Sequence, residues 1–361
     1  MRIGKRLILL AAIVLLLRGF VALGANTALD HLIQSAMGDA VLVEDIVARQ
    51  SSWIQPVADA ADDTISSCTL YEHRYTGEES TPTAPIQLPD RDLPIFRPGS
   101  ADQVQSITLT GGDDKPANAA GITVRNGTTF AIDVETLLNE PLSFDPSNNG
   151  TPTVLILHTH GTESFEPDGA DWYDNVDNYR TNDMNLNITR VGREVAEIFE
   201  ARGIRVIHSQ TLHDYPSFRG SYSRSLDEVE WYLAQHPEID IVIDIHRDAI
   251  MDLAGNYLRT DANIPGINSA QVMLVIGTDH AGLYHPHWRE NLKFALRLQA
   301  EMVAFHPTFA RPLSLREERF NAHVAPGAIL VEIGACGNTL QEALTTARIF
   351  AELTANVILG G

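Results

Sequence analysis

Short apolar runs alternate with longer amphipathic segments along the second half of the chain, from about residue 151 onward. The apolar runs have the length and the β-branched content of strands buried on both faces. They are TVLILH (153–158), IRVIHS (204–209), IDIVIDIH (239–246), QVMLVIG (271–277) and AILVEIG (328–334). Apolar residues recur at helical spacing between them, over 185–203, 223–237, 288–307 and 338–360. This alternation predicts an α/β fold with a mostly parallel twisted sheet and helices on both faces.

Signals at the ends of the predicted helices agree with these boundaries. Gly203 follows the first of them, and glycine is the residue that most often ends a helix in a left-handed conformation. Asn338 and Gln341 have the spacing of a capping box, so we expect them to open the last helix.

The first 25 residues have a different pattern. Arg2, Lys5 and Arg6 precede an apolar stretch that begins at Leu7 and runs to Ala25, interrupted by Arg18. Positive charge ahead of a short apolar segment is typical of membrane targeting. We predict that residues 1–25 form an uncleaved signal-anchor, a single-pass transmembrane segment that leaves the rest of the chain outside the cytoplasm. Cleavage at the small residues of ALGA is the alternative.

Breaker-rich segments separate this apolar stretch from the predicted sheet. Residues 76–100 are rich in Pro, Ser, Thr and acidic side chains, and residues 111–121 are rich in Gly and Asp. We therefore predict a juxtamembrane region and linker over 26–120. Asn126-Gly127, flanked by β-formers, is typical of a hairpin turn. It predicts a small β addition at 121–150 to the folded domain over 121–361.

Charge and cysteine content restrict the classes of function. The 361 residues carry a formal net charge of −21. Such a surface repels phosphate backbones, so we expect no nucleic-acid partner. The two cysteines, Cys68 and Cys336, form no CxxC pair and cannot supply a zinc site made of thiolates. A disulfide between them stays open at this point.

Metal-binding and acid–base side chains follow three of the predicted strands. His158, His160 and Glu163 end the first, His246 ends the third, and Glu332 lies near the end of the last. Because ligands bind at the carboxyl ends of strands in such sheets, these groups are expected to meet. Two histidines and one glutamate, His160, Glu163 and His246, are the ligand set of a hydrolytic zinc ion. Glu332 would then be the general base that takes the proton of the attacking water.

Other interpretations of these residues compete with this one. His158 follows the alternation of a strand and has the pattern of a histidine hydrogen-bonded inside the fold, yet it is also a rival ligand. Glu332 and Asp244 are harder to explain without a function, because a carboxylate in an apolar strand is costly unless it is paired. Cys336 could act as a thiol nucleophile, although its Gly-rich turn gives a small residue a structural reason. The chain contains no G-x-S-x-G motif and no P-loop.

Four ordered motifs resemble the stage II sporulation protein P family of membrane-anchored peptidoglycan hydrolases. They are TVLILHTHGTESF, HDYPSFRGSYSRSL, IDIVIDIHRDA and AILVEIGACGNTLQEA. The same strands are similar to zinc N-acetylmuramoyl-L-alanine amidases, and by that likeness His160 and His246 take the two histidine positions and Glu332 the catalytic position. The chain departs from that class at the glutamate ligand, for which Glu163 is the nearby replacement. His213 and His158 remain rival ligands.

The resemblance implies a function during engulfment and septal wall remodelling in sporulation. It implies cleavage of the amide between N-acetylmuramic acid and the L-Ala of the stem peptide, together with cutting of peptide cross-links. It also implies that a second wall hydrolase and a membrane scaffold protein are partners. Arg180 and Arg247 are the cations expected to stabilise the oxyanion or to hold a stem-peptide carboxylate.

A wall-binding or scaffold module that keeps the fold without turnover is the competing function. The complete set of two histidines and two glutamates favours the enzyme, because a binding module has no need of it.

Overall fold

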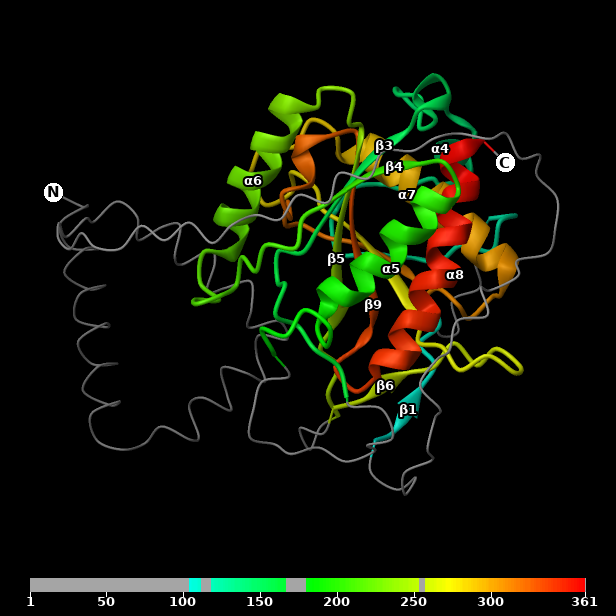
Figure 1. The fold of residues 1–361 in the computed structure, drawn as a ribbon. Helices are drawn as coiled ribbons and strands as arrows, with labels where there is room; N and C mark the ends of the chain where they lie inside the picture. The colour runs from blue at the N-terminus through cyan, green and yellow to red at the C-terminus, as the bar shows by residue number, and fades with distance from the viewer. Residues whose placement is uncertain (1–103, 112–117, 167–179, 253–256, 361) are drawn as a thin grey trace, which may run out of the picture. The chain divides into compact units, whose positions relative to one another are not determined.

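The five strands expected from the apolar runs lie together with two further strands in one seven-stranded sheet (Figure 1). The structure, a computed structural model, describes residues 104–111, 118–166, 180–252 and 257–360. The strands of this sheet are β2 (Val124–Asn126), β3 (Thr153–Leu157), β4 (Arg205–His208), β5 (Ile241–Asp248), β7 (Val272–Ile276), β8 (Leu313–Leu315) and β9 (Gly327–Ala335). The predicted membrane segment at 1–25, most of the predicted linker at 26–120 and Cys68 lie outside the described residues, so these predictions and the disulfide stay untested.

The strands lie in the order β2-β8-β7-β9-β5-β3-β4. Every neighbouring pair is parallel except β7 and β9, which are antiparallel. The predicted mostly parallel α/β fold is therefore confirmed. The carboxyl ends of β3, β5 and β9 lie along one edge of the sheet, which is the edge where the sequence places its reactive side chains.

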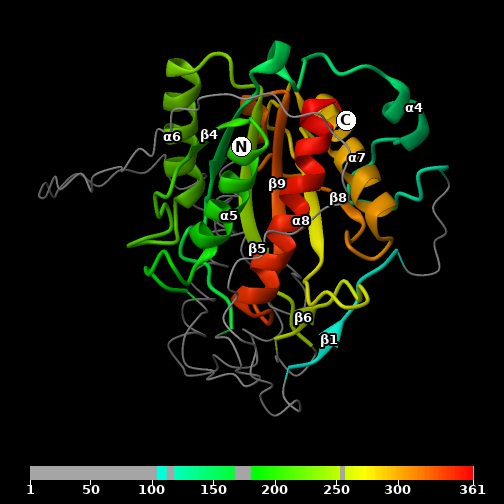
Figure 2. The ribbon, with the colours of Figure 1, turned by 45° about the vertical axis from the view of Figure 1, so that its right-hand side comes forward.

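Helices cover the two faces of the sheet unequally. Three of them pack on one face, which we call the three-helix face (Figures 1 and 2). They are α5 (Ile188–Ala201), α7 (Trp288–Phe305) and α8 (Leu340–Leu359). On the opposite face, called the α6 face, α6 (Ser221–Gln235) packs over β3 and β5 through a smaller apolar cluster. Among the helices that the structure describes, none is long and apolar enough to cross a membrane.

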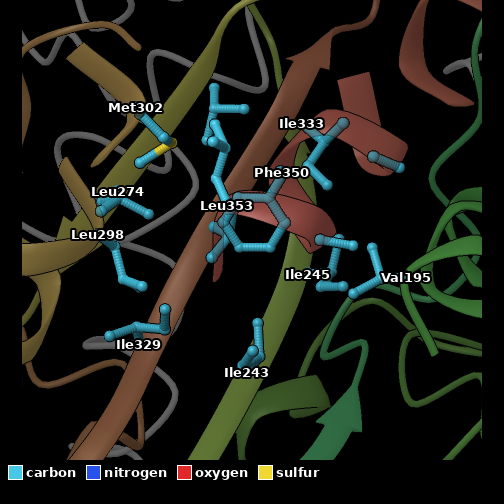
Figure 3. Close-up of a cluster of buried hydrophobic side chains, with 14 of the residues drawn as sticks. Val195, Ile243, Ile245, Leu274, Leu298, Met302, Ile329, Ile333, Phe350 and Leu353 are labelled. Carbon is cyan, nitrogen blue, oxygen red and sulfur yellow. The ribbon is translucent and has the colours of Figure 1, made fainter. Parts of the chain in front are cut away.

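Strand alternation divides the side chains between these faces. Val154 and Ile156 of β3 pack into the larger cluster on the three-helix face, whereas Leu155 and Leu157 join the smaller cluster under α6. Figure 3 shows the centre of the larger cluster, where Phe350 of α8 lies among aliphatic side chains from β5, β7 and β9. Each such side chain contributes roughly 1.5–3 kcal/mol when it leaves water. Apolar packing on the three-helix face thus holds the sheet rigid, and the polar groups of the sheet can lie on the α6 face.

Two details of the helix ends differ from or extend the sequence interpretation. The capping box of α8 is Thr339 with Glu342, not Asn338 with Gln341, so that prediction is wrong by one residue. Asn338 instead stabilises the turn before the helix, where its Oδ1 accepts hydrogen bonds from the backbone N–H groups of Ala335 and Thr260. Gly203 has a φ of +83° just beyond α5, as the sequence predicts.

The segment before β3 joins the main sheet in an unexpected way. β2 pairs in parallel with β8 at the sheet edge and does not fold back into a hairpin at Asn126-Gly127. The remaining described elements are β1 (Ser106–Ile107), β6 (Arg259–Thr260), α4 (Val134–Asn139) and the 3-10 turns η1 (Asn148–Gly150) and η2 (Ala322–Val324). β1 and β6 form a separate two-stranded parallel pair.

Candidate metal centre and general base

Three of the predicted ligands meet at the carboxyl edge of the sheet. Glu163 lies between the two histidines: its Oε1 is 3.6 Å from His160 Nδ1, and its Oε2 is 3.6 Å from His246 Nδ1. One ligand atom from each residue lies within 4.8 Å of the other two. Among the described residues, no other group of three histidine, cysteine or acidic side chains is arranged so that it could hold a metal ion.

The geometry of this cluster fits a metal ion better than it fits hydrogen bonds. Separations of 3.6 Å are too long for hydrogen bonds between these atoms. Ligands bound tetrahedrally at about 2.1 Å from one zinc ion lie about 3.4 Å apart, which is close to the observed spacing. His160 Nε2 is buried without a hydrogen-bond partner. The three side chains could therefore hold zinc.

The turn after β3 sets the position of Glu163. Its backbone N–H donates to His160 O, and its own carbonyl accepts from the first residue of α5, Ile188. Arg247 holds the same turn from the next strand, because its backbone N–H donates to Glu163 Oε2 and its Nε donates to Ser164 O. At 6% exposure Arg247 lies beneath the turn, which favours a positioning role over a role on the rim of the site.

Aromatic rings enclose His160. Phe218 stacks on the imidazole with ring centroids 4.5 Å apart, and Tyr222 meets it edge-on at 5.5 Å. Phe218 comes from the segment that leads into α6 and Tyr222 from the first turn of this helix, and both belong to the motif HDYPSFRGSYSRSL of the sequence. These contacts fix the ring plane of a residue that lies beyond the end of its strand.

Burial and neighbouring charges act on the cluster in opposite directions. Burial lowers the pKa of His246, but the carboxylates of Asp244 and Glu163 outweigh it and hold this pKa well above its usual value. Burial raises the pKa of Glu163, but contacts with His160 and His246 and the charge of Arg247 hold it well below its usual range. The centre thus concentrates negative charge around the histidines, which favours a bound cation.

Glu332 lies beside His246 in the sheet. The two residues are register partners on β9 and β5, and both side chains point to the α6 face. Burial and then the charge of Asp248 raise the pKa of Glu332 to about 8. The residue as a whole is half-buried, but its Oε2 is buried and has no hydrogen-bond partner. A carboxyl group in this state is suited to exchange a proton with a substrate rather than to support the fold.

His158 and His213, the rival ligands, contact other residues of the protein outside the metal centre. His158 points to the three-helix face, where its Nδ1 donates to Ile245 O at 2.9 Å and its Nε2 lies 2.9 Å from His208 Nε2. His213 Nε2 contacts Glu228 at 2.8 Å. Neither residue belongs to the three-ligand cluster.

Arg180 lies at the rim of the centre with its side chain 29% exposed. Its guanidinium pairs with Asp214, approaches Glu163 Oε1 at 3.7 Å and lies 4.7 Å above the Phe218 ring. Asp214 also accepts from the backbone and hydroxyl of Thr162. Asp214 and Phe218 received no role from the sequence, although both lie in a motif that we had singled out. The acidic and aromatic residues directly after His213 were the available signal.

A family model described as Stage II sporulation protein P matches residues 100–355. The Stage II sporulation protein P of Bacillus subtilis (strain 168) is 29% identical over 217 residues, which cover 55% of this chain and 50% of that protein. The chain therefore matches only about half the length of this curated relative.

Two solved structures are similar at lower identity. An N-acetylmuramoyl-L-alanine amidase from Clostridium difficile 630 is 18% identical, with a TM-score of 0.34, over 58% of this chain and 96% of that chain. The CwlD amidase from Clostridioides difficile, solved in complex with the GerS lipoprotein, is 16% identical, with a TM-score of 0.34, over 57% of this chain and 94% of that chain.

Proposed function

The chain belongs to the stage II sporulation protein P family, and from this premise we propose that it is a zinc-dependent peptidoglycan hydrolase of sporulating cells. The bond that we propose for cleavage is the amide between the lactyl group of N-acetylmuramic acid and the L-Ala of the stem peptide. The observation that carries the proposal is the buried cluster of His160, Glu163 and His246 beside an unpartnered carboxyl oxygen of Glu332.

His160, Glu163 and His246 would hold the metal. Zinc bound by such a set supplies Lewis-acid polarisation of the amide carbonyl and increases the acidity of water. Two histidines and one glutamate are also the set of protein ligands found in known hydrolytic zinc sites.

Glu332 would move the proton. It accepts the proton of the attacking water as the water oxygen bonds to the carbonyl carbon, and then donates it to the amide nitrogen as the C–N bond breaks. The products are a carboxylate on the lactyl group and an amine on L-Ala. Burial and Asp248 raise the pKa of Glu332 to about 8, and a cation held by the three ligands would lower it toward the ionised form that this role needs at the start.

Arg180 is the cation that we propose for substrate binding. It is partly exposed, and it lies at the rim where a stem-peptide carboxylate would approach. A guanidinium binds a carboxylate through two parallel hydrogen bonds. Its pairing with Asp214 would hold the side chain extended for this contact.

We further propose that the protein is anchored in the cell membrane, with the catalytic domain on the cell-wall side. The basic and apolar pattern of residues 1–25 supports this placement. A second wall hydrolase and a membrane scaffold are the proposed partners, on the basis of family membership. Protease added to intact protoplasts should digest the catalytic domain, whereas digestion only after lysis would contradict the placement.

The test of the activity uses the purified full chain and isolated cell walls. We expect one zinc ion per chain by elemental analysis. We also expect release of stem peptides with a free L-Ala amine, identified by mass spectrometry. Products cut only within the peptide cross-links would move the cleavage site to another bond. Binding to walls without any released product would support the wall-binding module instead.

A further inference from the structure

A strained turn lies between β8 and β9, eleven residues before Glu332. Phe320 and Asn321 both have left-handed backbones, with φ of 49° and 57°. This conformation is uncommon outside glycine and costs energy for a bulky residue such as phenylalanine. Two such residues in succession persist only where the surrounding structure holds them in place.

The side chain of Asn321 ties this turn to the first turns of α6. Its Nδ2 donates to Tyr222 O at 2.7 Å and to Ser225 Oγ at 3.2 Å. Asparagine tolerates the left-handed conformation better than most residues, and here its amide uses both protons. The strain is therefore offset by contacts that all point toward α6.

From Ser225 a buried chain of polar groups continues toward the metal centre. Ser225 Oγ lies 2.8 Å from Thr159 Oγ1, which lies 2.6 Å from Asp244 Oδ2. A carboxylate only accepts hydrogen bonds, so the single hydroxyl proton of Thr159 goes to Asp244, and Ser225 then donates to Thr159. Ser225 and Thr159 have no exposed surface, so water cannot replace these bonds.

Asp244 completes the connection to a proposed ligand. Its Oδ1 accepts from the backbone N–H of Thr159 at 2.8 Å and lies 3.0 Å from His246 Nε2. This 3.0 Å contact does not meet the geometry of a well-formed hydrogen bond, but it places the carboxylate directly against the ring. The other ring nitrogen of His246 faces Glu163. A carboxylate behind a histidine ligand is the usual device that sets the orientation of the ring.

The same turn reaches the second histidine through aromatic contacts. The Phe320 ring lies 6.2 Å from that of Tyr222, and Tyr222 meets His160 edge-on. Thus Asn321 connects to Asp244 through hydrogen bonds and from there to His246 through a 3.0 Å contact. Its neighbour Phe320 connects to His160 through aromatic rings. No role in the hydrolytic chemistry requires this strained turn, so its position calls for another explanation.

We propose that Asn321, Ser225, Thr159 and Asp244 are positioning residues that set the orientation of His246 and thereby the affinity of the centre for zinc. This inference rests on the zinc site proposed above and deepens it. It assigns the metal affinity partly to a turn that contains no ligand. Asp244 acts directly on the ring, whereas Ser225 and Asn321 act by holding Thr159 and Asp244 in place.

The test measures zinc affinity of the full chain, purified in detergent, by competition with a chromophoric chelator. The visible absorption of the Co²⁺-substituted protein reports the ligand geometry without reference to activity. We expect Ser225→Ala to weaken zinc binding about 5–10-fold and Asp244→Asn about 10–100-fold, with altered Co²⁺ spectra. Ser223→Ala is the matched control, since Ser223 is an exposed serine on the same helix turn and should bind zinc like wild type.

A second variant guards against loss of folding. Asn321→Gly removes both side-chain bonds, while glycine adopts the left-handed backbone without strain. Thr159→Ser keeps the hydroxyl and should bind zinc nearly as wild type does, whereas Thr159→Val should not. Wild-type affinity and an unchanged Co²⁺ spectrum in both Ser225→Ala and Asn321→Gly would overturn the proposal. A wild-type protein that binds no zinc would overturn the metal site itself, and this inference with it.

Discussion

Two pairs of histidines lie close together in this protein, and their ring nitrogens have different surroundings; His208 is half-buried and the other three are buried. His158 and His208 meet on the three-helix face, where the rings contact each other and a backbone carbonyl. His160 and His246 lie at the carboxyl edge with Glu163 between them, and His160 Nε2 is buried without a partner. In the first pair both nitrogens of His158 have partners in the protein, whereas each histidine of the second pair has one nitrogen that faces Glu163.

The difference follows from strand alternation. His158 continues the face of Val154 and Ile156, so it points into the apolar layer against α5. His160 comes after β3 has ended, where the chain turns over the sheet edge. His158 thus supports the fold, whereas His160, only two positions later, lies where it could bind a metal ion. The predictions below test this contrast.

The largest effect is expected for the ligands. Loss of a residue that only supports a ligand weakens metal binding about 10–100-fold. His160→Ala or His246→Ala removes a ligand itself and should therefore weaken zinc binding more than this. His208→Asn, which alters the other pair, should retain one zinc ion per chain. Elemental analysis with chelator competition measures both. A zinc-loaded His246→Ala protein would contradict the assignment of the two pairs.

The next effect concerns the two glutamates. Glu332→Gln keeps the shape of the side chain but cannot accept a proton, so the rate of stem-peptide release should fall by about 10²–10⁴ with zinc retained. Glu163→Gln should instead weaken zinc binding. Rates on purified cell walls and zinc content separate the two roles. A zinc-free Glu332→Gln with a zinc-loaded Glu163→Gln would show that we have exchanged them.

Acid should weaken the fold through His158. Burial lowers its pKa to about 4, below its usual value of 6.5. As pH falls through this window, the unfolded chain binds a proton that the folded chain does not, so stability decreases. The expected slope is at most roughly 1.4 kcal/mol per pH unit. Urea unfolding of wild type and His158→Asn at several pH values isolates this contribution, and parallel profiles of the two proteins would exclude it.

The smallest effect is expected for Gly192→Ala. A Cβ at this position of α5 would lie 2.4 Å from His158 Nε2 and 2.8 Å from His208 Nε2. Overpacking of this kind costs about 1–3 kcal/mol. Helix propensity alone would make the same substitution stabilising, so the sign of the change in unfolding free energy is itself the control. A more stable variant would show that His158 and His208 move aside at little cost in free energy. Zinc affinity should change little.

The sequence predicts most of the sheet because its long apolar runs can form little else. β3, β4 and β7 lie within those runs, whereas β5 and β9 extend one or two residues beyond them. The four long helices lie in the predicted amphipathic segments, except that α6 begins two residues earlier, at Ser221. β8 was missed because it has only three residues, LSL, directly after Pro312. Without β8, the reversal of direction between β7 and β9 could not be foreseen.

The candidate site was predictable where its residues follow strands. His160, Glu163, His246 and Glu332 are brought together as expected, although their roles stay predictions. The alternation of Val154, Ile156 and His158 could have removed His158 from the rival ligands. The roles of Asp214 and Ser225 could not be foreseen. Their contacts with Thr162 and Thr159 depend on how the loops fold over the edge, which no local pattern specifies.

The position of β9 affects the order in which the site can form during synthesis. β9 is the last of the described strands in the chain, yet it lies in the middle of the sheet, between β5 and β7. A nascent chain that has emerged only as far as β8 carries all three proposed ligands but lacks Glu332 and the strand that joins the two halves of the sheet. Such long-range pairings are also slow to form. An incomplete chain would therefore lack the proposed general base, and the proposed hydrolysis would begin only once the last strand has been inserted.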